Sequence, residues 1–301
     1  MKKTILIAAA LFAVLAWTGC RKIDEEIVEP EVVPEQPAGS YTLTIEATKG
    51  ADTKALELSG STLNAYWVTG EKVAVYADGA YKGLLSATVN PSDNTKATLS
   101  GTLDNADGIV ANAVLTLLFP RADWDYTGQD GTDPSASGTL ATKYDYATAS
   151  VTVDSVSGSD VTTTGTASFV NEQSMYRFGF KVGGAGENIA IKSFTVSSTN
   201  NTLVSSRSWG AGAWTDTFSS ITVTAAGTPT LPFASLRNTR VGSGNGDTYS
   251  FSVIGSDDAL YLGSKDIPSS AMDTHGKFIS ATGISVTKSD LAKSGSVNVV
   301  W

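Results

Sequence analysis

The sequence predicts an all-β protein of two tandem antiparallel β-sandwich domains, preceded by a short export signal and a flexible tether. Three observations lead to this fold class. From residue 41 onward, short stretches rich in Val, Thr, Ile, Tyr and Phe alternate apolar with polar side chains. Gly, Asn, Asp and Ser separate these stretches, as they do at turns between antiparallel strands. Few segments show a helical period, so the pattern favours sandwiches over a parallel α/β sheet.

The export signal is expected at residues 1–19. Lys2 and Lys3 precede an apolar stretch, residues 5–16, that is too short to span a bilayer. Thr-Gly-Cys follows at residues 18–20, and Cys20 is the only cysteine. This arrangement resembles the bacterial lipobox, with Trp17 where the lipobox prefers Leu. We therefore expect Cys20 to carry acyl chains such as palmitate, the alternative being a stray unpaired cysteine.

Residues 20–40 form the predicted tether, because they are rich in Glu and Pro and have few side chains that can pack. Residues 21–26 resemble the Lys-plus-acidic signal that directs Bacteroidetes lipoproteins to the outer face of the outer membrane. An ordinary charged linker is the alternative. The expected location is the cell surface, with the lipid on Cys20 as the membrane attachment.

The charge balance argues against nucleic acid as a partner. The chain has 21 basic and 30 acidic side chains and a net charge of −9 at pH 7, and loss of the signal makes it more negative. Such a surface repels phosphate backbones and lacks the density of basic residues that counterion release requires.

The first sandwich is expected at residues 41–160. Alternation predicts strands at residues 41–48, 72–76 and 150–154. Residues 112–119 are more continuously apolar, which predicts a central strand covered on both faces that ends at Pro120.

The second sandwich is expected at residues 161–301, because a Thr- and Ser-rich stretch at 156–166 separates two sets of strands. Its strands are expected at residues 175–182, 189–197, 220–225, 247–254 and 280–288. Residues 123–141 are expected to form a long polar loop, which is either functional or loosely ordered.

Several segments resemble, in order and spacing, those of Bacteroidetes fimbrillin-like proteins, the major and minor fimbrial subunits and their relatives. The resemblance covers most of the first domain and the start of the second. The matching segments are Thr-Lys-Ala at 53–55, Trp-Val-Thr-Gly-Glu-Lys-Val-Ala-Val-Tyr at 67–76, Leu-Leu-Phe-Pro at 117–120, Gln-Asp-Gly-Thr at 129–132, Lys-Tyr-Asp-Tyr-Ala-Thr-Ala at 143–149, Ser-Phe-Val-Asn at 168–171 and Tyr-Arg-Phe-Gly-Phe at 176–180.

The resemblance implies two transthyretin-like sandwiches, delivered to the cell surface as a lipoprotein and built into a fimbrium, or pilus. It also implies that a trypsin-like protease cuts in the loop after the first strand, and that a strand from the next subunit fills the vacated groove. An incoming strand can satisfy both the unpaired backbone and the apolar groove. In this chain the loop offers Lys49 and Lys54 as cleavage positions.

A candidate donor strand lies at residues 296–301, where Val297, Val299 and Trp301 alternate on one face. The alternative is that these residues form the last strand of their own sandwich.

No catalytic site, cofactor or metal is expected. His275 is the only histidine, and no Gly-x-Ser-x-Gly turn at a strand-helix junction accompanies it. Acidic residues at 123, 125, 130 and 133 offer oxygen ligands for Ca²⁺, but their spacing is not that of an EF-hand.

Four aromatic residues allow a second interpretation. Trp124, Tyr126, Trp209 and Trp214 are candidate platforms for sugar rings, or else core residues. The function classes rank as a fimbrial structural or anchor subunit, then a surface glycan-binding lipoprotein, then a surface hydrolase. The corresponding partners are other fimbrial subunits, joined by β-strand addition, and host or bacterial surface ligands.

Overall fold

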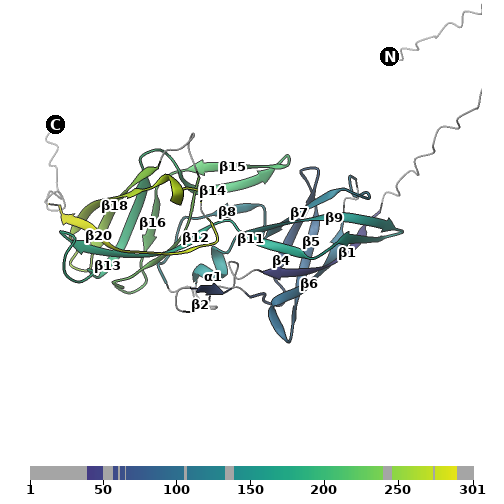
Figure 1. The fold of residues 1–301 in the computed structure, drawn as a ribbon, viewed down its shortest axis with the longest axis horizontal. Helices are drawn as coiled ribbons and strands as arrows, with labels where there is room; N and C mark the ends of the chain where they lie inside the picture. The colour runs from purple at the N-terminus through teal and green to yellow at the C-terminus, as the bar shows by residue number, and fades with distance from the viewer. Residues whose placement is uncertain are drawn as a thin grey trace, which may run out of the picture. The chain divides into compact units, whose positions relative to one another are not determined.

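The computed structural model describes residues 39–49, 57–59, 62–64, 66–104, 107–132, 139–239, 246–273 and 275–289. Strands dominate these residues, as predicted, and the only helices within these ranges are the short α1 (Thr139–Lys143) and η1 (Ser269–Ala271). All of these described residues belong to one compact unit. The strands form two large sheets and one small hairpin, β2 (Glu57–Ser59) with β3 (Thr62–Asn64) (Figure 1).

The first sheet has eight strands and closes into a ring. Strand β1 pairs antiparallel with β6 along one edge, and parallel with β10 and β11 along the other. Because β1 is hydrogen-bonded to other strands along both edges, this part of the chain is a closed barrel. The sequence predicts a sandwich here. The strands are β1 (Tyr41–Lys49), β4 (Lys72–Ala77), β5 (Ala80–Asn90), β6 (Asp93–Leu103), β7 (Val114–Phe119), β9 (Ala147–Ser157), β10 (Asp160–Thr164) and β11 (Ala167–Asn171).

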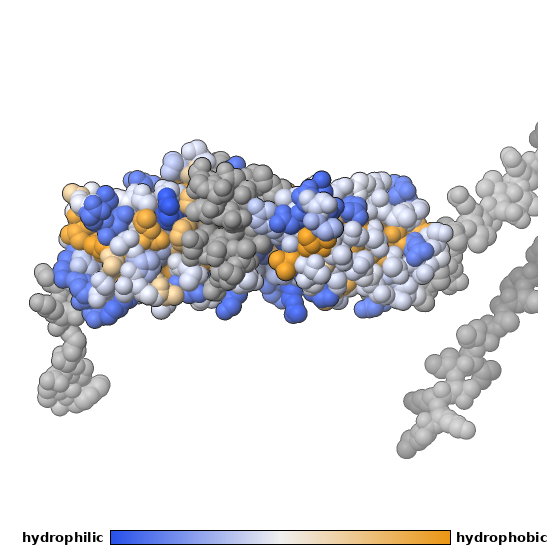
Figure 2. All heavy atoms as spheres, turned by 90° about the horizontal axis from the view of Figure 1, so that it is seen from below, coloured by the Kyte–Doolittle hydropathy of each residue, from blue (hydrophilic) through white to orange (hydrophobic). Residues whose placement is uncertain are grey.

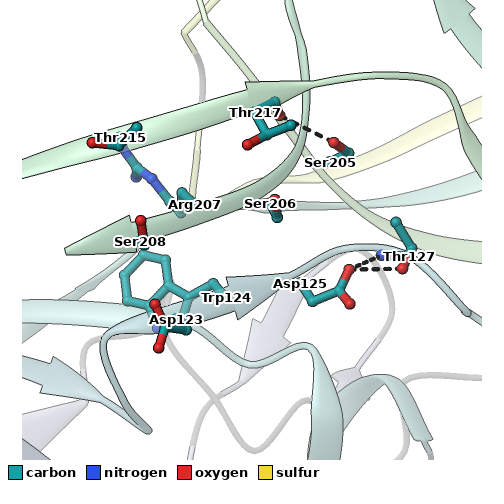
Figure 3. Close-up of a pocket in the computed structure, with 10 residues that line it drawn as sticks. All are labelled: Asp123, Trp124, Asp125, Thr127, Ser205, Ser206, Arg207, Ser208, Thr215 and Thr217. Atoms are coloured by element: carbon teal, nitrogen blue, oxygen red, sulfur yellow. Dashed lines mark hydrogen bonds between the residues drawn. The ribbon is translucent and has the colours of Figure 1, made fainter.

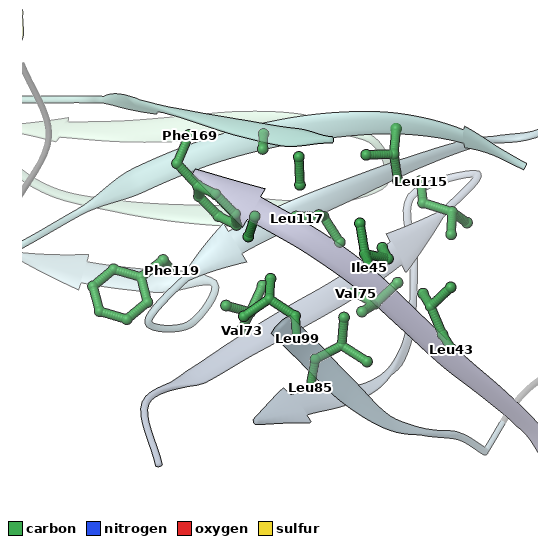
Figure 4. Packing of buried hydrophobic residues seen from close by; sticks show 14 of the residues in the cluster. Leu43, Ile45, Val73, Val75, Leu85, Leu99, Leu115, Leu117, Phe119 and Phe169 are labelled. Atoms are coloured by element: carbon green, nitrogen blue, oxygen red, sulfur yellow. The ribbon is translucent and has the colours of Figure 1, made fainter. Parts of the chain in front are cut away.

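Alternating apolar side chains fill the ring. Leu43 and Ile45 of β1 meet Val75 of β4, Leu99 of β6 and Leu117 of β7 in the interior (Figure 4). Closure brings strands close together at Gly101, where a Cβ would lie 2.2 Å from the carbonyl oxygen of Leu84. Glycine therefore permits the close approach of the β5 backbone to β6 at this position.

The second sheet has ten strands, in the order β15-β14-β17-β12-β20-β19-β18-β13-β16, with β8 also paired to β14. Its elements are β8 (Asp123–Asp125), β12 (Ser174–Val182), β13 (Ile191–Ser198), β14 (Leu203–Gly210), β15 (Ala213–Phe218), β16 (Ile221–Thr224), β17 (Phe233–Asn238), β18 (Asp247–Gly255), β19 (Leu260–Ile267) and β20 (Phe278–Lys288). Its core is rich in aromatic rings, among them Phe178, Phe180, Phe194 and Phe251.

The polar segment 129–131 bridges two strands of the second sheet. The carbonyl oxygen of Gln129 accepts a hydrogen bond from the main-chain N–H of Thr224 in β16, and that of Gly131 accepts one from Phe233 in β17. The buried side-chain amide of Gln129 pairs with the main chain of Ser235, as the backbone of a neighbouring strand would. Its Oε1 accepts from the N–H of Ser235 at 2.7 Å, and its Nε2 donates to the carbonyl of Ser235 at 2.7 Å. In the first half of the expected loop 123–141, residues 129–131 are thus hydrogen-bonded to the second sheet.

The boundary between the sheets differs from the one expected at residue 160. Strands β10 and β11 belong to the ring, because β10 pairs with β9 and β11 pairs with both β9 and β1. The chain first reaches the second sheet at β8, returns to the ring at β9, and passes to the second sheet again at residues 172–173, between β11 and β12. The Thr- and Ser-rich stretch 156–166 suggests a linker because it has little to bury, yet most of its backbone belongs to the β9–β10 hairpin.

Strand β7 confirms the expected central position and two-sided cover. It lies between β4 and β9 and ends at Phe119, immediately before Pro120. Leu117 faces the ring interior, while Leu118 packs outside it with Ala74 and Tyr76 and against Trp209 of β14.

Candidate functional site

Strand β1 is the first described strand of the chain and completes the ring. It buries Tyr41, Leu43, Ile45 and Ala47 and exposes most of the residues between them. Burying a large apolar side chain contributes roughly 1.5–3 kcal/mol. A ring without β1 would therefore present an apolar groove between two strand edges, which is what an extended segment can occupy.

The last residue of β1, Lys49, is buried, with an exposed fraction of 2 %. Its Nζ donates hydrogen bonds to Glu71 Oε2 at 2.9 Å and to the carbonyl oxygen of Tyr66 at 3.2 Å. The same nitrogen lies 4.0 Å from Asp145 Oδ2. A buried ammonium group requires partners of this kind, because its removal from water is costly.

Aromatic rings enclose the Lys49 ammonium group. Nζ lies 4.1 Å from the ring centroid of Trp67 and 4.1 Å from that of Phe119. Trp67 also meets the ring of Phe169 edge-on, at a centroid distance of 5.3 Å. Such rings attract a cation electrostatically and exclude water from it. We call Lys49, Trp67, Glu71, Phe119 and Asp145 the Lys49 site.

Glu71 is the unusual acid of the Lys49 site. Burial raises the pKa of its carboxyl group, and the nearby Asp145 raises it further, while Lys49 and the main-chain N–H of Val68 lower it. Burial outweighs the opposing effects, because desolvation disfavours the charged carboxylate. Glu71 therefore keeps its proton to a higher pH than an exposed glutamate does.

The burial of Lys49 argues against it as a protease cleavage position. A trypsin-like enzyme must insert the lysine side chain into its own specificity pocket. Here that side chain is buried inside the closed first sheet, against the aromatic ring of Trp67. Cleavage after Lys49 would require the end of β1 to open first. Lys54, the other expected position, lies outside the described residues.

A second feature is a polar concavity on the outer face of β8, β14 and β15, with a volume of about 400 Å³ (Figure 3). The strand register aligns its side chains in two rows across the three strands. One row is Asp125, Ser206 and Thr217, and the other is Asp123, Ser208 and Thr215. We call these six residues the polar face.

The aromatic residues proposed as sugar platforms lie mostly in the core. Trp124 and Tyr126 have exposed fractions of 1 % and 0 %, so neither offers a free ring face, and for these two the core interpretation is confirmed over the sugar platform. Trp124 packs against Trp214 at a centroid distance of 4.1 Å. Trp214 and Trp209 are half-buried and meet edge-on at 5.2 Å.

Two acidic residues of segment 123–132, Asp125 and Asp130, stabilise turns. Asp125 Oδ1 accepts hydrogen bonds from both the N–H and the hydroxyl group of Thr127. Asp130 does the same with Thr132. These carboxylates stabilise local turns. Among the described residues, no group of three His, Cys, Asp or Glu side chains is placed to hold a metal ion.

Glu172 joins the two sheets where the chain passes between them. Its Oε1 accepts a hydrogen bond from Thr148 of β9 at 2.8 Å. Its Oε2 lies 2.9 Å from Arg207 Nη1 and 2.7 Å from Arg237 Nη1, both on the second sheet. Arg207 in turn pairs with Asp216 Oδ1 at 2.8 Å and stacks over the ring of Trp214. One carboxylate thus holds the ring to the second sheet.

The remaining predicted site residues lie outside the described part of the chain. These are Cys20 and the candidate donor residues Val297, Val299 and Trp301. Within the described residues, no helix has the length and apolar character needed to cross a membrane. On the face shown in Figure 2, hydrophobic residues form separate small patches among polar ones.

Sequence reasoning missed the Lys49 site, although the signal was present. Trp67, Glu71, Phe119 and Asp145 each lie in a segment that resembles the fimbrillin-like proteins. The fold brings these separate segments together around one lysine. Arg207 and Arg237 carried no local signal, since single arginines in alternating strands usually face solvent.

Comparison with known proteins gives weak structural similarities. No family model matches the chain, and no curated protein matches it. A candidate cell adhesion protein from Bacteroides uniformis is 12 % identical, with a TM-score of 0.46, over 82 % of this chain and 96 % of that one. A candidate cell adhesion protein from Bacteroides ovatus is 11 % identical, with a TM-score of 0.41, over 82 % and 95 %.

A third similar structure is the major pilin of Streptococcus pyogenes, which is 10 % identical with a TM-score of 0.22, over 84 % of this chain and 99 % of that one. With TM-scores below 0.5, these similarities carry no conclusion about the function of this chain.

Proposed function

We propose that the chain is a lipid-anchored cell-surface protein that acts as a fimbrial structural or anchor subunit. The observation that carries this proposal is the place of β1. It is the first strand of the ring and is bonded along both edges. Residues 50–56, which follow it in the sequence, contain Lys54. A cut there leaves β1 held only by contacts within the ring.

Energetics favour exchange of β1 over simple loss. The strand buries three large apolar side chains, Tyr41, Leu43 and Ile45, and hydrogen bonds on both edges. At roughly 1.5–3 kcal/mol for each such side chain, an empty groove is costly. A cut chain would therefore keep β1 until another extended segment replaces it. In a fimbrium, that segment is a strand of the neighbouring subunit, for which residues 296–301 are the candidate.

Limited proteolysis tests the cleavage step. The folded full-length chain is treated with trypsin, and the new N-termini are mapped by mass spectrometry over time. We expect the first cut within the ring domain to follow Lys54, and Lys49 to stay uncut while the ring is folded. A first cut after Lys49, or within β4 to β7, would overturn this route of maturation.

Substitution at the candidate donor strand tests assembly. Val297→Asp with Val299→Asp places charges on the face that would enter a neighbour's groove. We expect SDS-resistant complexes from the cell surface to disappear. The matched control is Leu262→Asp on β19, because Leu262 is already 41 % exposed. Unchanged complexes in the double variant would exclude this segment as the donor.

A second candidate function is glycan binding at the polar face. The observation in its favour is the open concavity of about 400 Å³ lined by hydroxyl and carboxylate groups, which can bond to sugar hydroxyls. A polysaccharide panel is titrated against the full chain and against Asp123→Ala with Ser208→Ala. Saturable binding that this variant loses, and that Thr222→Ala on β16 retains, would support it. Binding that all forms show equally would exclude the polar face.

A further inference from the structure

We propose that Lys49 and Asp145 become joined by an intramolecular amide bond, which ties the end of β1 to the segment just before β9. The reacting atoms are the Nζ of Lys49 and the Cγ of Asp145. Glu71, in contact with the same nitrogen, transfers the protons. The bond itself does not depend on the proposed function.

The geometry of the Lys49 site brings the reacting groups together before any reaction. Nζ of Lys49 lies 4.0 Å from Asp145 Oδ2 and 2.9 Å from Glu71 Oε2. Lys49 and Asp145 have exposed fractions of 2 % and 4 %. Lys49 is the last residue of β1, and Asp145 lies two residues before β9 begins. Holding two groups in place converts a slow bimolecular reaction into an intramolecular one.

The surroundings limit the access of water to the reacting groups. The rings of Trp67 and Phe119 lie against Nζ, and Lys49 and Asp145 are both buried. Formation of an amide removes one positive and one negative charge from the interior. Exclusion of water also slows hydrolysis of the product.

The reaction balances without any added reagent. A proton passes from the Lys49 ammonium group to the Asp145 carboxylate through Glu71. The neutral amine then attacks Cγ, and the new C–N bond forms as the C–OH bond breaks. Glu71 takes a second proton from nitrogen and gives it to the departing hydroxyl group, which leaves as water. One ammonium and one carboxylate thus become one amide and one water molecule, with Glu71 unchanged.

The bond would decide what happens to β1 after cleavage at Lys54. A linked β1 cannot leave the ring, so the lipid, the tether and β1 would stay on the chain. That consequence rests on the proposed function. It favours an anchor subunit over a shaft subunit, because a groove that keeps β1 cannot accept a strand from a neighbour. Without the bond, β1 is free to exchange and the chain suits the fimbrial shaft.

Peptide mapping of the full chain tests the bond. The protein is denatured and digested with trypsin, which does not cut after an acylated lysine. We expect a branched peptide that joins residues 23–54 to residues 144–177 and is lighter than their sum by one water molecule. Fragmentation should place the branch between Lys49 and Asp145. Separate unlinked peptides ending at Lys49 and beginning at Tyr144 would overturn the proposal.

Variants separate the chemistry from folding. Glu71→Gln keeps the size of the side chain but cannot accept protons, so we expect a folded chain with at least a tenfold lower linked fraction. Lys82→Arg is the matched control, because Lys82 is also buried, at 3 % exposure, and donates to a main-chain carbonyl. It should leave the linked fraction unchanged. Full linkage in Glu71→Gln would exclude Glu71 as the proton-transfer group.

The two proposals fail in different ways. An absent branched peptide, with SDS-resistant complexes still present, would remove the bond and leave a shaft subunit. A branched peptide without any such complexes would leave the bond in a surface protein that is not fimbrial.

Discussion

The change Glu172→Gln tests the junction between the two sheets. It keeps the shape of the side chain and removes the negative charge that Arg207 and Arg237 share. Both arginines are largely buried, with side-chain exposed fractions of 5 % and 10 %, and Glu172 has 14 %. The variant therefore leaves two guanidinium groups in the interior with fewer acceptors.

The expected cost follows from what each arginine retains. Breaking a buried ion pair by removing one partner costs about 3–5 kcal/mol. Arg207 keeps Asp216 at 2.8 Å, and Arg237 keeps the carbonyl oxygen of Glu172 at 2.5 Å. These remaining partners place the expected loss at the lower end, about 3 kcal/mol.

Urea unfolding at pH 7, followed by tryptophan fluorescence, measures the loss of unfolding free energy. The matched control is Lys96→Gln, which removes the exposed pair of Lys96 with Asp93. Side-chain exposures of 54 % and 35 % mean that solvent screens this pair, so its removal should change stability very little. If Glu172→Gln costs no more than Lys96→Gln, the reasoning that one carboxylate holds the two sheets together is refuted.

Three further changes test other parts of the account. Gln129→Leu leaves the main-chain N–H and carbonyl of Ser235 without their partner, so urea unfolding should show a loss of about 3 kcal/mol; a loss near zero would contradict the strand-like role of this amide. Leu43→Ala opens a cavity under β1 and should lower the free energy of unfolding by about 2–5 kcal/mol. In a chain that also carries Lys49→Arg, the same change should speed the release of β1 after cleavage at Lys54. Equal release rates with and without Leu43→Ala would contradict this. Burial alone would raise the pKa of Asp247, but hydrogen bonds from Ser198, Thr202 and two main-chain N–H groups outweigh it and lower that pKa. The stability from Asp247 is therefore present above its ordinary pKa and lost as the pH falls through the lower folded value; thermal melts between pH 5 and pH 2 should fall less steeply in Asp247→Asn, and parallel curves would argue against it.

Much of the strand structure follows from the alternation in the sequence. Residues 41–48, 72–76, 175–182 and 247–254 alternate apolar with polar side chains, and each lies in a strand of the structure. The apolar run 112–119 likewise marks the central strand β7. Local pattern suffices for β1 and β18 because one face of each strand is buried, whereas β4 and β12 are covered on both faces.

Closure of the ring could not be read from the sequence. It depends on the parallel pairing of β1 with β10 and β11, which are more than a hundred residues away in the chain. Strand β10 is Thr-rich and largely exposed, so its sequence resembles a linker. Pairing of this kind is set by main-chain hydrogen bonds between distant segments, and the pattern of side chains does not predict it.

The Lys49 site was missed for a related reason. A lysine at the end of a predicted strand is usually exposed, and only tertiary contacts show that Lys49 lies between Trp67 and Phe119. Gln129 is a similar case, because its role depends on Ser235, in another part of the chain. Burial of Trp124 and Tyr126 was the expected alternative to sugar binding, and the structure places both in the core.

Electrophoresis of surface extracts from the cells that produce this protein tests the fimbrial assignment most directly. Samples in SDS are run without heating and after boiling, and the chain is detected with an antibody against the second sheet. The account predicts a ladder of complexes that collapses to a single band on boiling, because an inserted strand is held by a full set of hydrogen bonds and buried side chains. A single monomer band in unheated samples, with all of the chain still carrying its lipid, would contradict it.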